Sequence, residues 1–296
     1  MKPFSKLLNM APFVLTAACG QAFAQSSGLT EREAKMFSMS ESYERFMGRW
    51  SRLLAAPFLR FADVREGARV LDVGTGTGSL AIAAEQAGAR EVVGVDPSEG
   101  FIGYAKQRSK SPRTAFEVGD AQALRYPNAS FDRTMALLVM NFIPDHVKAI
   151  SEMRRVTRPG GVVAACVWDY DAGMEMLRFF WDEVLALDPT MAPKDERNMK
   201  LSHRGELAAL WKRAGLTDVR EEPLSIEQAF SSFDDYWGSF LKGAGPGGAY
   251  VVSLSETRRR ELEARMKKRL LGNREDGAFV LKARAWCARG NAPSPL

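Results

Sequence analysis

The stretch Val70-Leu71-Asp72-Val73-Gly74-Thr75-Gly76-Thr77-Gly78-Ser79-Leu80 decides how this chain folds. A short apolar run ends beside an acidic residue, three glycines alternate with threonines, and small and apolar residues then resume. This order predicts a buried strand, a tight turn and the start of a helix. Glycine lets the backbone bend sharply and lets a ligand approach the main chain. The first turn of the helix would point unpaired N–H groups at that ligand.

The spacing of the glycines separates two classes of nucleotide-binding loop. A dinucleotide fingerprint places its third glycine five residues after the first, and this chain has Ser79 there. Asp72 stands two residues before Gly74, where a carboxylate would repel a pyrophosphate but suit an ammonium group. This D-x-G-x-G-x-G pattern resembles the first motif of the class I S-adenosylmethionine-dependent methyltransferases. The resemblance implies that the loop wraps the methionine part of S-adenosyl-L-methionine.

The run Glu91–Asp96 predicts a second strand that ends in a carboxylate. Asp96 lies at the carboxyl end of this strand, where it can accept hydrogen bonds from both hydroxyls of a ribose. Nicotinamide enzymes share this arrangement. Asp96 therefore predicts an adenosine ligand without choosing between the two classes.

Further motifs follow in the order found in the methyltransferase family. Gly119-Asp120-Ala121 ends a third strand over 114–118, and the matching Asp of the family contacts the adenine amino group. A fourth strand is predicted over 131–140, and the series RRVTRPGGVV precedes a fifth over 162–168. The resemblance implies that the cofactor contacts Asp72, Gly74, Thr75, Gly76, Gly78, Asp96, Pro97, Asp120, Ala121 and Leu138.

These elements predict an α/β fold with a doubly wound, Rossmann-like sheet of about seven strands, whose last strand is antiparallel. A sixth strand is predicted over 219–226 and the last over 278–286. We expect the methyltransferase domain to span 41–296, with a helical cap inserted at about 228–277. Residues 1–24 are assigned to a signal peptide or a mis-set start, and 25–40 to a linker.

Two aromatic segments are candidates for a cover over the site. Residues 41–62 show helical periodicity, and the run YERFMGRWS resembles the segment that covers the cofactor in some small-molecule methyltransferases. The predicted cap carries a second cluster of aromatic residues. Simple packing onto the sheet stays open as the alternative for both segments. The substrate or lid candidates are Tyr43, Trp50, Tyr236 and Trp237.

The resemblance implies transfer of a methyl group from S-adenosyl-L-methionine to a small molecule, in the manner of the ubiquinone/menaquinone-biosynthesis-like enzymes. An NAD(P)-dependent oxidoreductase and a non-catalytic S-adenosylmethionine-binding module remain as alternatives. Because the methyl group arrives activated, the protein mainly has to align the acceptor and exclude water. A base, if one is needed, is sought among His146, Asp169 and Tyr170.

The amino-acid composition limits the kinds of partner that this chain is expected to bind. The chain has 296 residues, 46% of them hydrophobic, and a net charge of +5, which is not a nucleic-acid signature. We expect no nucleic acid as partner, since 141–144 (NFIP) lacks the consecutive prolines of adenine-amino methyltransferases. No apolar run reaches the length of a transmembrane helix. The spacing of cysteine and histidine predicts no metal site.

The N-terminus allows two interpretations. Lys2 and Lys6, the apolar stretch 7–19 and the small residues before Gln25 are typical of a secretory signal. Alternatively the start is mis-set and the enzyme is cytoplasmic, where its cofactor is made. Cys166 and Cys287 are expected to be buried free thiols.

Overall fold

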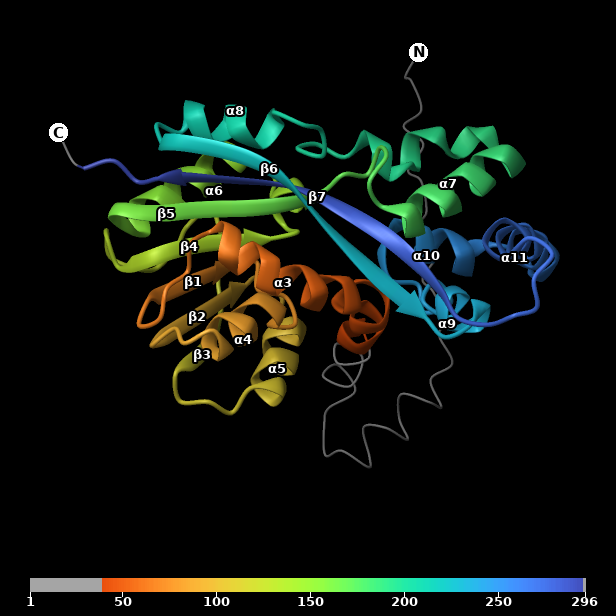
Figure 1. The fold of residues 1–296 in the computed structure, drawn as a ribbon, viewed down its shortest axis with the longest axis horizontal. Helices are drawn as coiled ribbons and strands as arrows, with labels where there is room; N and C mark the ends of the chain where they lie inside the picture. The colour runs from red at the N-terminus through yellow and green to blue at the C-terminus, as the bar shows by residue number, and fades with distance from the viewer. Residues whose placement is uncertain (1–38, 295–296) are drawn as a thin grey trace, which may run out of the picture.

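The computed structural model describes residues 39–294. The predictions for the leader at 1–24 and for most of the linker at 25–40 lie outside this range. Within it, a single sheet of seven strands runs in the order β3-β2-β1-β4-β5-β7-β6 (Figure 1). The strands are β1 (Arg69–Val73), β2 (Glu91–Asp96), β3 (Thr114–Val118), β4 (Phe131–Leu137), β5 (Thr157–Trp168), β6 (Thr217–Phe230) and β7 (Phe279–Asn291).

The strand directions confirm the predicted fold class. Strands β3, β2, β1, β4 and β5 pair in parallel, and β7 is antiparallel to both of its neighbours. Strand β1 is the middle one of the five parallel strands, with Val73 beside Val95 of β2 and Asp72 beside Met135 of β4. Since parallel strands end at the same edge, the loops after β1, β2 and β4 meet there.

Helices cover both faces of the sheet (Figure 1). Helices α3 (Arg49–Phe61), α4 (Ser79–Gln86) and α5 (Glu99–Arg108) lie on one face, and α6 (His146–Val156) and α8 (Glu206–Arg213) on the other. Helix α6 begins as the sequence predicted, because the side chain of Asp145 accepts a hydrogen bond from the backbone N–H of Lys148 at 2.9 Å.

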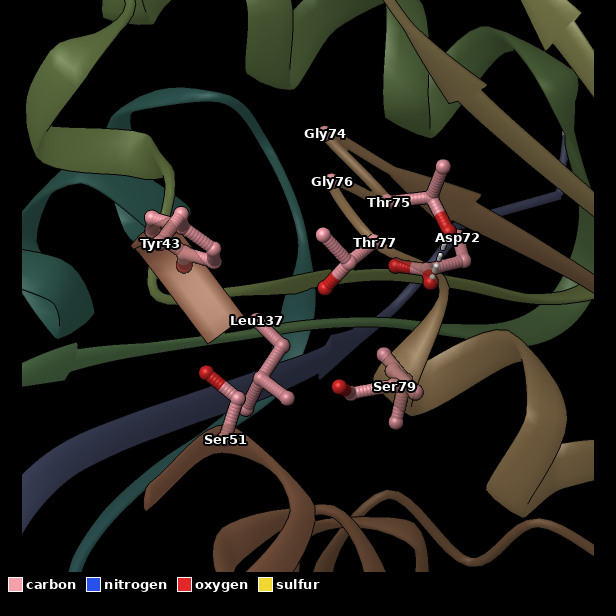
Figure 2. Close-up of a pocket in the computed structure, with 10 residues that line it drawn as sticks. Tyr43, Ser51, Asp72, Gly74, Thr75, Gly76, Thr77, Ser79 and Leu137 are labelled. Atoms are coloured by element: carbon pink, nitrogen blue, oxygen red, sulfur yellow. Dashed lines mark hydrogen bonds between the residues drawn. The ribbon is translucent and has the colours of Figure 1, made fainter. Parts of the chain in front are cut away.

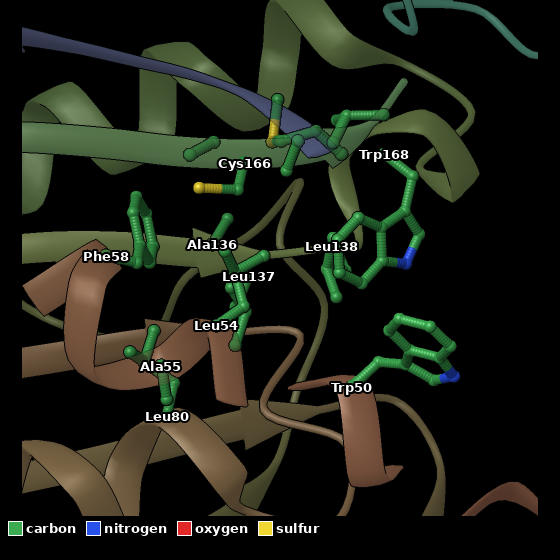
Figure 3. Packing of buried hydrophobic residues seen from close by; sticks show 14 of the residues in the cluster. Trp50, Leu54, Ala55, Phe58, Leu80, Ala136, Leu137, Leu138, Cys166 and Trp168 are labelled. Atoms are coloured by element: carbon green, nitrogen blue, oxygen red, sulfur yellow. The ribbon is translucent and has the colours of Figure 1, made fainter. Parts of the chain in front are cut away.

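Helix α3 packs its apolar face against the sheet. Trp50, Leu54 and Phe58, spaced four residues apart, are all fully buried, and Figure 3 shows them facing the ends of β4 and β5. Residues 39–43 are α-helical and continue into the π-helical turn η1 (Glu44–Gly48) before α3. The predicted helix across Gly48 is therefore confirmed, and its π turn is a feature that periodicity did not reveal.

The last two strands are longer than predicted and carry a helical insert. Between β6 and β7 the chain forms α9 (Phe233–Trp237), α10 (Gly245–Ser253) and α11 (Glu256–Leu271), which gather at the far end of these strands beside α7 (Glu175–Leu187) (Figure 1). Short 3-10 turns η2 (Met140–Phe142), η3 (Pro189–Lys194) and η4 (Glu196–Asn198) join the other elements. Arg265 and Arg269 of α11 form ion pairs with Glu183 of α7.

The expectation of free thiols is wrong. Cys166 of β5 lies directly opposite Cys287 of β7, with 4.2 Å between their Cα atoms, and the two residues form a disulfide. Both side chains are fully buried, as expected. The sequence could not reveal the bond, because the pairing depends on the register of two strands 121 residues apart. In the described part of the chain, no helix is long and apolar enough to cross a membrane.

Candidate cofactor and acceptor site

The glycine loop is folded back against the end of β2. The backbone N–H of Gly74 donates to the carbonyl of Val95 at 2.7 Å, and Gly74 and Gly76 have φ angles of +68° and +52°. A Cβ on Gly74 would lie 2.5 Å from the side chain of Val139, whereas one on Gly76 would meet nothing within 4 Å. Gly74 is therefore required for packing, and Gly76 borders open space.

A hollow of about 290 Å³, part of it open to solvent, lies over this loop. Figure 2 shows the side chains that surround it, drawn from the glycine loop, from the N-terminal helix and from the end of β4. They are Tyr43, Ser51, Asp72, Gly74, Thr75, Gly76, Thr77, Ser79, Leu80 and Leu137.

Asp72 is the charged group at the base of the hollow, and only 1% of it is exposed. Its Oδ2 accepts hydrogen bonds from Thr75 Oγ1 at 2.7 Å and from the Ala81 N–H at 3.0 Å, while Oδ1 is buried without a partner. Burial raises the pKa of this carboxyl to about 7, and the nearby charge of Asp96 adds to the effect. An orphaned carboxylate oxygen fits a ligand that brings a cationic donor.

Asp96 links the glycine loop to the next helix. Its carboxylate accepts from the N–H of Gly76 at 3.0 Å and from the N–H of Ser98 at 2.9 Å. Burial raises the pKa of this carboxyl, although the two backbone donors oppose the shift. Each oxygen keeps a lone pair for a further donor. Pro97, the next residue, is exposed at the same edge.

The ends of β3 and β4 bring the remaining predicted contacts to this edge. Asp120 is exposed and accepts from the N–H of Gln122 at 2.8 Å, with Ala121 between them in the same turn. Leu138 has a left-handed φ of +61° and donates its N–H to the carbonyl of Cys166 at 2.9 Å. A non-glycine residue held in this conformation is typical of functional sites.

The N-terminal segment, which the sequence analysis named as a candidate cover, is tied to the glycine loop through polar contacts that the sequence did not reveal. Tyr43 lines the hollow and packs its ring 5.2 Å from that of Phe101, and burial raises the pKa of its hydroxyl to about 12. Glu44 accepts a hydrogen bond from Thr77 Oγ1 and forms an ion pair with Arg108 at 3.2 Å. The π-helical turn that presents Glu44 is a form found frequently at functional sites.

The three candidate bases differ in their surroundings. Asp169 is buried and paired with Arg284 at 2.8 Å, so its carboxylate is already engaged. Tyr170 is fully buried, and burial raises the pKa of its hydroxyl well above 10, so it stays protonated at neutral pH. His146 has a buried Nε2 without a hydrogen-bond partner, and partial burial lowers the pKa of its ring. A neutral imidazole with a free nitrogen has the properties of a base.

Three of the four lid candidates have well-defined packing. Trp50 and Tyr236 are fully buried, with the indole N–H of Trp50 donating to Met176 Sδ at 3.2 Å and the Tyr236 hydroxyl donating to the Met176 carbonyl at 3.0 Å. Trp237 is 3% exposed and stacks on Phe233. These residues join α3 to the insert, and only Tyr43 lines the hollow itself.

Sequence reasoning missed two residues whose side-chain polar groups are buried, Asn141 and Glu196. Asn141 follows β4 in the turn η2, and Glu196 lies in the segment after α7. Burial raises the pKa of the Glu196 carboxyl to about 7, and its Oε2 accepts from the indole N–H of Trp181 at 2.7 Å. The position of Asn141 just after a predicted strand was the available signal.

Comparisons with known proteins agree with this geometry. Residues 71–165 match the family described as "Methyltransferase domain". The chain is 30% identical over 184 residues to the demethylmenaquinone methyltransferase of Geobacillus kaustophilus, covering 57% of this chain and 79% of that protein. It is 37% identical over 102 residues to the ubiquinone/menaquinone biosynthesis C-methyltransferase UbiE of Geobacter sulfurreducens, covering 32% and 40% of the two chains.

Solved structures share the fold. The YcgJ protein of Bacillus subtilis superposes with a TM-score of 0.52 at 17% identity, covering 81% of this chain and 98% of that one. Phosphoethanolamine N-methyltransferase 2 of Haemonchus contortus, solved in complex with S-adenosyl-L-methionine, gives a TM-score of 0.53 at 21% identity, covering 93% and 60%.

Proposed function

The chain belongs to the S-adenosylmethionine-dependent methyltransferases, and from this premise we propose which of its residues do the work. It transfers the methyl group of S-adenosyl-L-methionine to a small-molecule acceptor. We propose that Asp72, Asp96 and the loop 74–78 hold the cofactor, with Pro97, Asp120, Ala121 and Leu138 around its adenosine part.

One observation supports this assignment most directly. Asp72 Oδ1 is buried at the base of the hollow without a hydrogen-bond partner, an unfavourable state for a carboxylate. The α-ammonium group of the cofactor is the kind of donor that would complete it. Gly76 borders open space in the same hollow, so its backbone is accessible to the rest of the methionine part of the cofactor.

The cofactor supplies a methyl group that its sulfonium has already activated. The protein then has to exclude water, orient the acceptor and, for an acceptor hydroxyl or acidic carbon, remove a proton. We propose His146 as the group that takes this proton, because its imidazole is neutral and its Nε2 is free. Asp169 is committed to Arg284, and Tyr170 keeps its own proton.

Calorimetry with purified protein tests the cofactor assignment. We expect binding of S-adenosylmethionine and S-adenosylhomocysteine, and no comparable binding of NADH. Asp96→Ala should weaken both ligands, since each lost charge-assisted hydrogen bond costs about 1.5–3 kcal/mol. Asp234→Ala, at an exposed aspartate of α9, is the matched control. Unchanged affinity in Asp96→Ala would remove Asp96 from the site, and a turnover assay separates an enzyme from a binding module.

The compartment is a separate proposal. We propose that the enzyme works in the cytoplasm, where its cofactor is made. Disulfides are uncommon there, but access of a thiol to the sulfurs controls the exchange reaction, and both sulfurs of the Cys166–Cys287 bond are fully buried. Mass spectrometry of protein from the native host is the test. A chain that begins at Gln25 would instead mean export.

A further inference from the structure

Asn141 is a buried amide that nothing in the described chain satisfies. It lies in η2, three residues beyond the strained Leu138, and both its Nδ2 and its Oδ1 are buried without a hydrogen-bond partner. Buried side-chain polar atoms are nearly always paired in folded proteins. An amide with a donor and an acceptor both unpaired is therefore an expected place for a ligand.

Tyr170 stands beside this amide. It follows β5, which is paired with β4 so that Leu137 lies next to Cys166. The Asn141 amide is close enough to lower the pKa of the Tyr170 hydroxyl, but the two groups do not meet in hydrogen-bond geometry. Burial dominates and keeps the phenol protonated. Tyr170 can therefore donate a hydrogen bond to a ligand that the amide also contacts.

The pair lies near one wall of the cofactor hollow. Tyr43, which lines the hollow, interacts electrostatically with Tyr170 and so lies near it. The acidic groups around Tyr170 already have donors of their own, because Asp169 pairs with Arg284 and Glu196 accepts from Trp181. The polar atoms left for a ligand thus belong to a neutral amide and a neutral phenol.

These groups favour an uncharged ligand that has a hydrogen-bond donor and an acceptor on neighbouring atoms. A side-chain amide offers an N–H and a carbonyl side by side, which match a ligand with an acceptor and a donor on neighbouring atoms. A single hydroxyl meets only part of that requirement, and a lone ion leaves one edge of the amide unpaired.

Building on the proposed function, we propose that Asn141 and Tyr170 form an acceptor subsite for a neutral group with a hydrogen-bond donor and acceptor on adjacent atoms. The two vicinal oxygens of a catechol are such a group. Asn141 contacts the acceptor directly and fixes which of its atoms faces the methyl group.

Two coloured probes of similar size test this. The protein is saturated with S-adenosylhomocysteine and titrated with 4-nitrocatechol or 4-nitrophenol by absorbance, at a pH below the pKa of both. We expect 4-nitrocatechol to bind about ten-fold more tightly, one hydrogen-bonded group being worth roughly that factor. Asn141→Leu, close in shape but apolar, should abolish this preference and weaken 4-nitrocatechol more than 4-nitrophenol. Asn273→Leu, at an exposed turn after α11, is the control.

The accompanying measurements distinguish the possible failures. S-adenosylhomocysteine must bind Asn141→Leu as tightly as it binds the unaltered protein, and the melting temperature should stay equal or rise, because an unsatisfied buried amide is removed. Tyr170→Phe gives a second variant and should reduce the preference as well. Equal binding of the two probes, no binding of either, or a preference that survives Asn141→Leu would overturn the inference. Failure of S-adenosylhomocysteine to bind the unaltered protein would overturn the proposed function instead.

Discussion

The hydroxyl of Thr75 donates a hydrogen bond of 2.7 Å to Oδ2 of Asp72, while the other carboxylate oxygen, Oδ1, is buried without a partner. The loop thus holds its own carboxylate in a fixed orientation before any ligand arrives. Such preorganisation lowers the cost of binding, because the carboxylate is already desolvated and oriented. It also has a consequence for the dependence of binding on pH.

Binding of S-adenosylmethionine should release protons below about pH 7. Burial raises the pKa of Asp72 from 3.8 to about 7, so part of the carboxyl is protonated in the free protein. An ammonium group beside it favours the charged form, and affinity should therefore rise with pH up to about 7 and then level off. Calorimetry in two buffers with different heats of ionisation measures the proton count. Methylthioadenosine, which lacks the amino-acid part, should release none, and an equal release with both ligands would contradict the role of Asp72.

Arg108→Ala should make the cofactor dissociate faster. Arg108 binds both Glu44, at 3.2 Å, and the Thr77 carbonyl, at 2.8 Å, and so ties the N-terminal segment to the glycine loop. The pair is largely buried, with 24% and 11% of the two side chains exposed, which favours a larger effect than that of a surface pair. We expect a several-fold weaker affinity, about 1 kcal/mol, mainly in the dissociation rate. Stopped-flow competition measures this rate, and Lys106→Ala on the exposed side of α5 is the control. Identical dissociation rates for the two variants would mean that the contacts of Arg108 with Glu44 and Thr77 do not retain the cofactor.

The segments that we propose for the cofactor could be located from the sequence, whereas those that we propose for the acceptor could not. The strands 91–96 and 114–118 were predicted with their observed bounds. The loop after β1 could be located from the spacing of its glycines. The surroundings of the residues near the proposed acceptor are set by contacts between segments that lie far apart in the sequence. Glu196 is buried only because the segment after α7 packs onto Trp181, and no local pattern marks it. Asn141 stands out only because its buried amide atoms lack hydrogen-bond partners, which the sequence cannot show.

The same argument explains the errors in the fold. Strand β6 is an edge strand, paired only with β7, and its many charged residues hide its full extent from 217 to 230. Helix α7 was not predicted, although its buried residues Met176, Leu177, Phe180, Trp181 and Val184 recur at helical spacing. The disulfide needed the register of β5 against β7.

The free energy of unfolding should fall as pH rises from 4.5 to about 7, and Glu196 should account for part of the fall. Burial raises the pKa of its carboxyl from 4.5 to about 7, so in this window the native state holds a proton that the unfolded chain has lost. Stability is therefore lost through the window and is constant above it, by about 3 kcal/mol at most for this group. Asp72 acts in the same direction.

Glu196→Gln isolates the contribution of Glu196, since an amide oxygen can still accept the Trp181 N–H but cannot titrate. Urea unfolding at several pH values should show a shallower decline for this variant than for the unaltered protein. Glu222→Gln, at an exposed position of β6, should change nothing. Parallel curves for Glu196→Gln and the unaltered protein would mean that Glu196 titrates normally.

Trp237→Ala distinguishes a moving lid from a packed core. Trp237 is 3% exposed, stacks on Phe233 and lies 6.0 Å from the ring of Phe240, which in turn meets Phe46 at 5.3 Å in the N-terminal segment. We expect this chain of rings to act as core, so the substitution should lower the free energy of unfolding by about 3–5 kcal/mol.

Activity and cofactor affinity of Trp237→Ala should then fall together, in proportion to the folded fraction at the assay temperature. Leu241→Ala, at a neighbouring side chain that is 41% exposed, should cost little in stability and serves as the control. A lid gives the opposite pattern, in which methyl transfer is damaged far more than cofactor binding while the melting temperature holds. That result would restore Trp237 to the acceptor site and require the insert to move during the catalytic cycle.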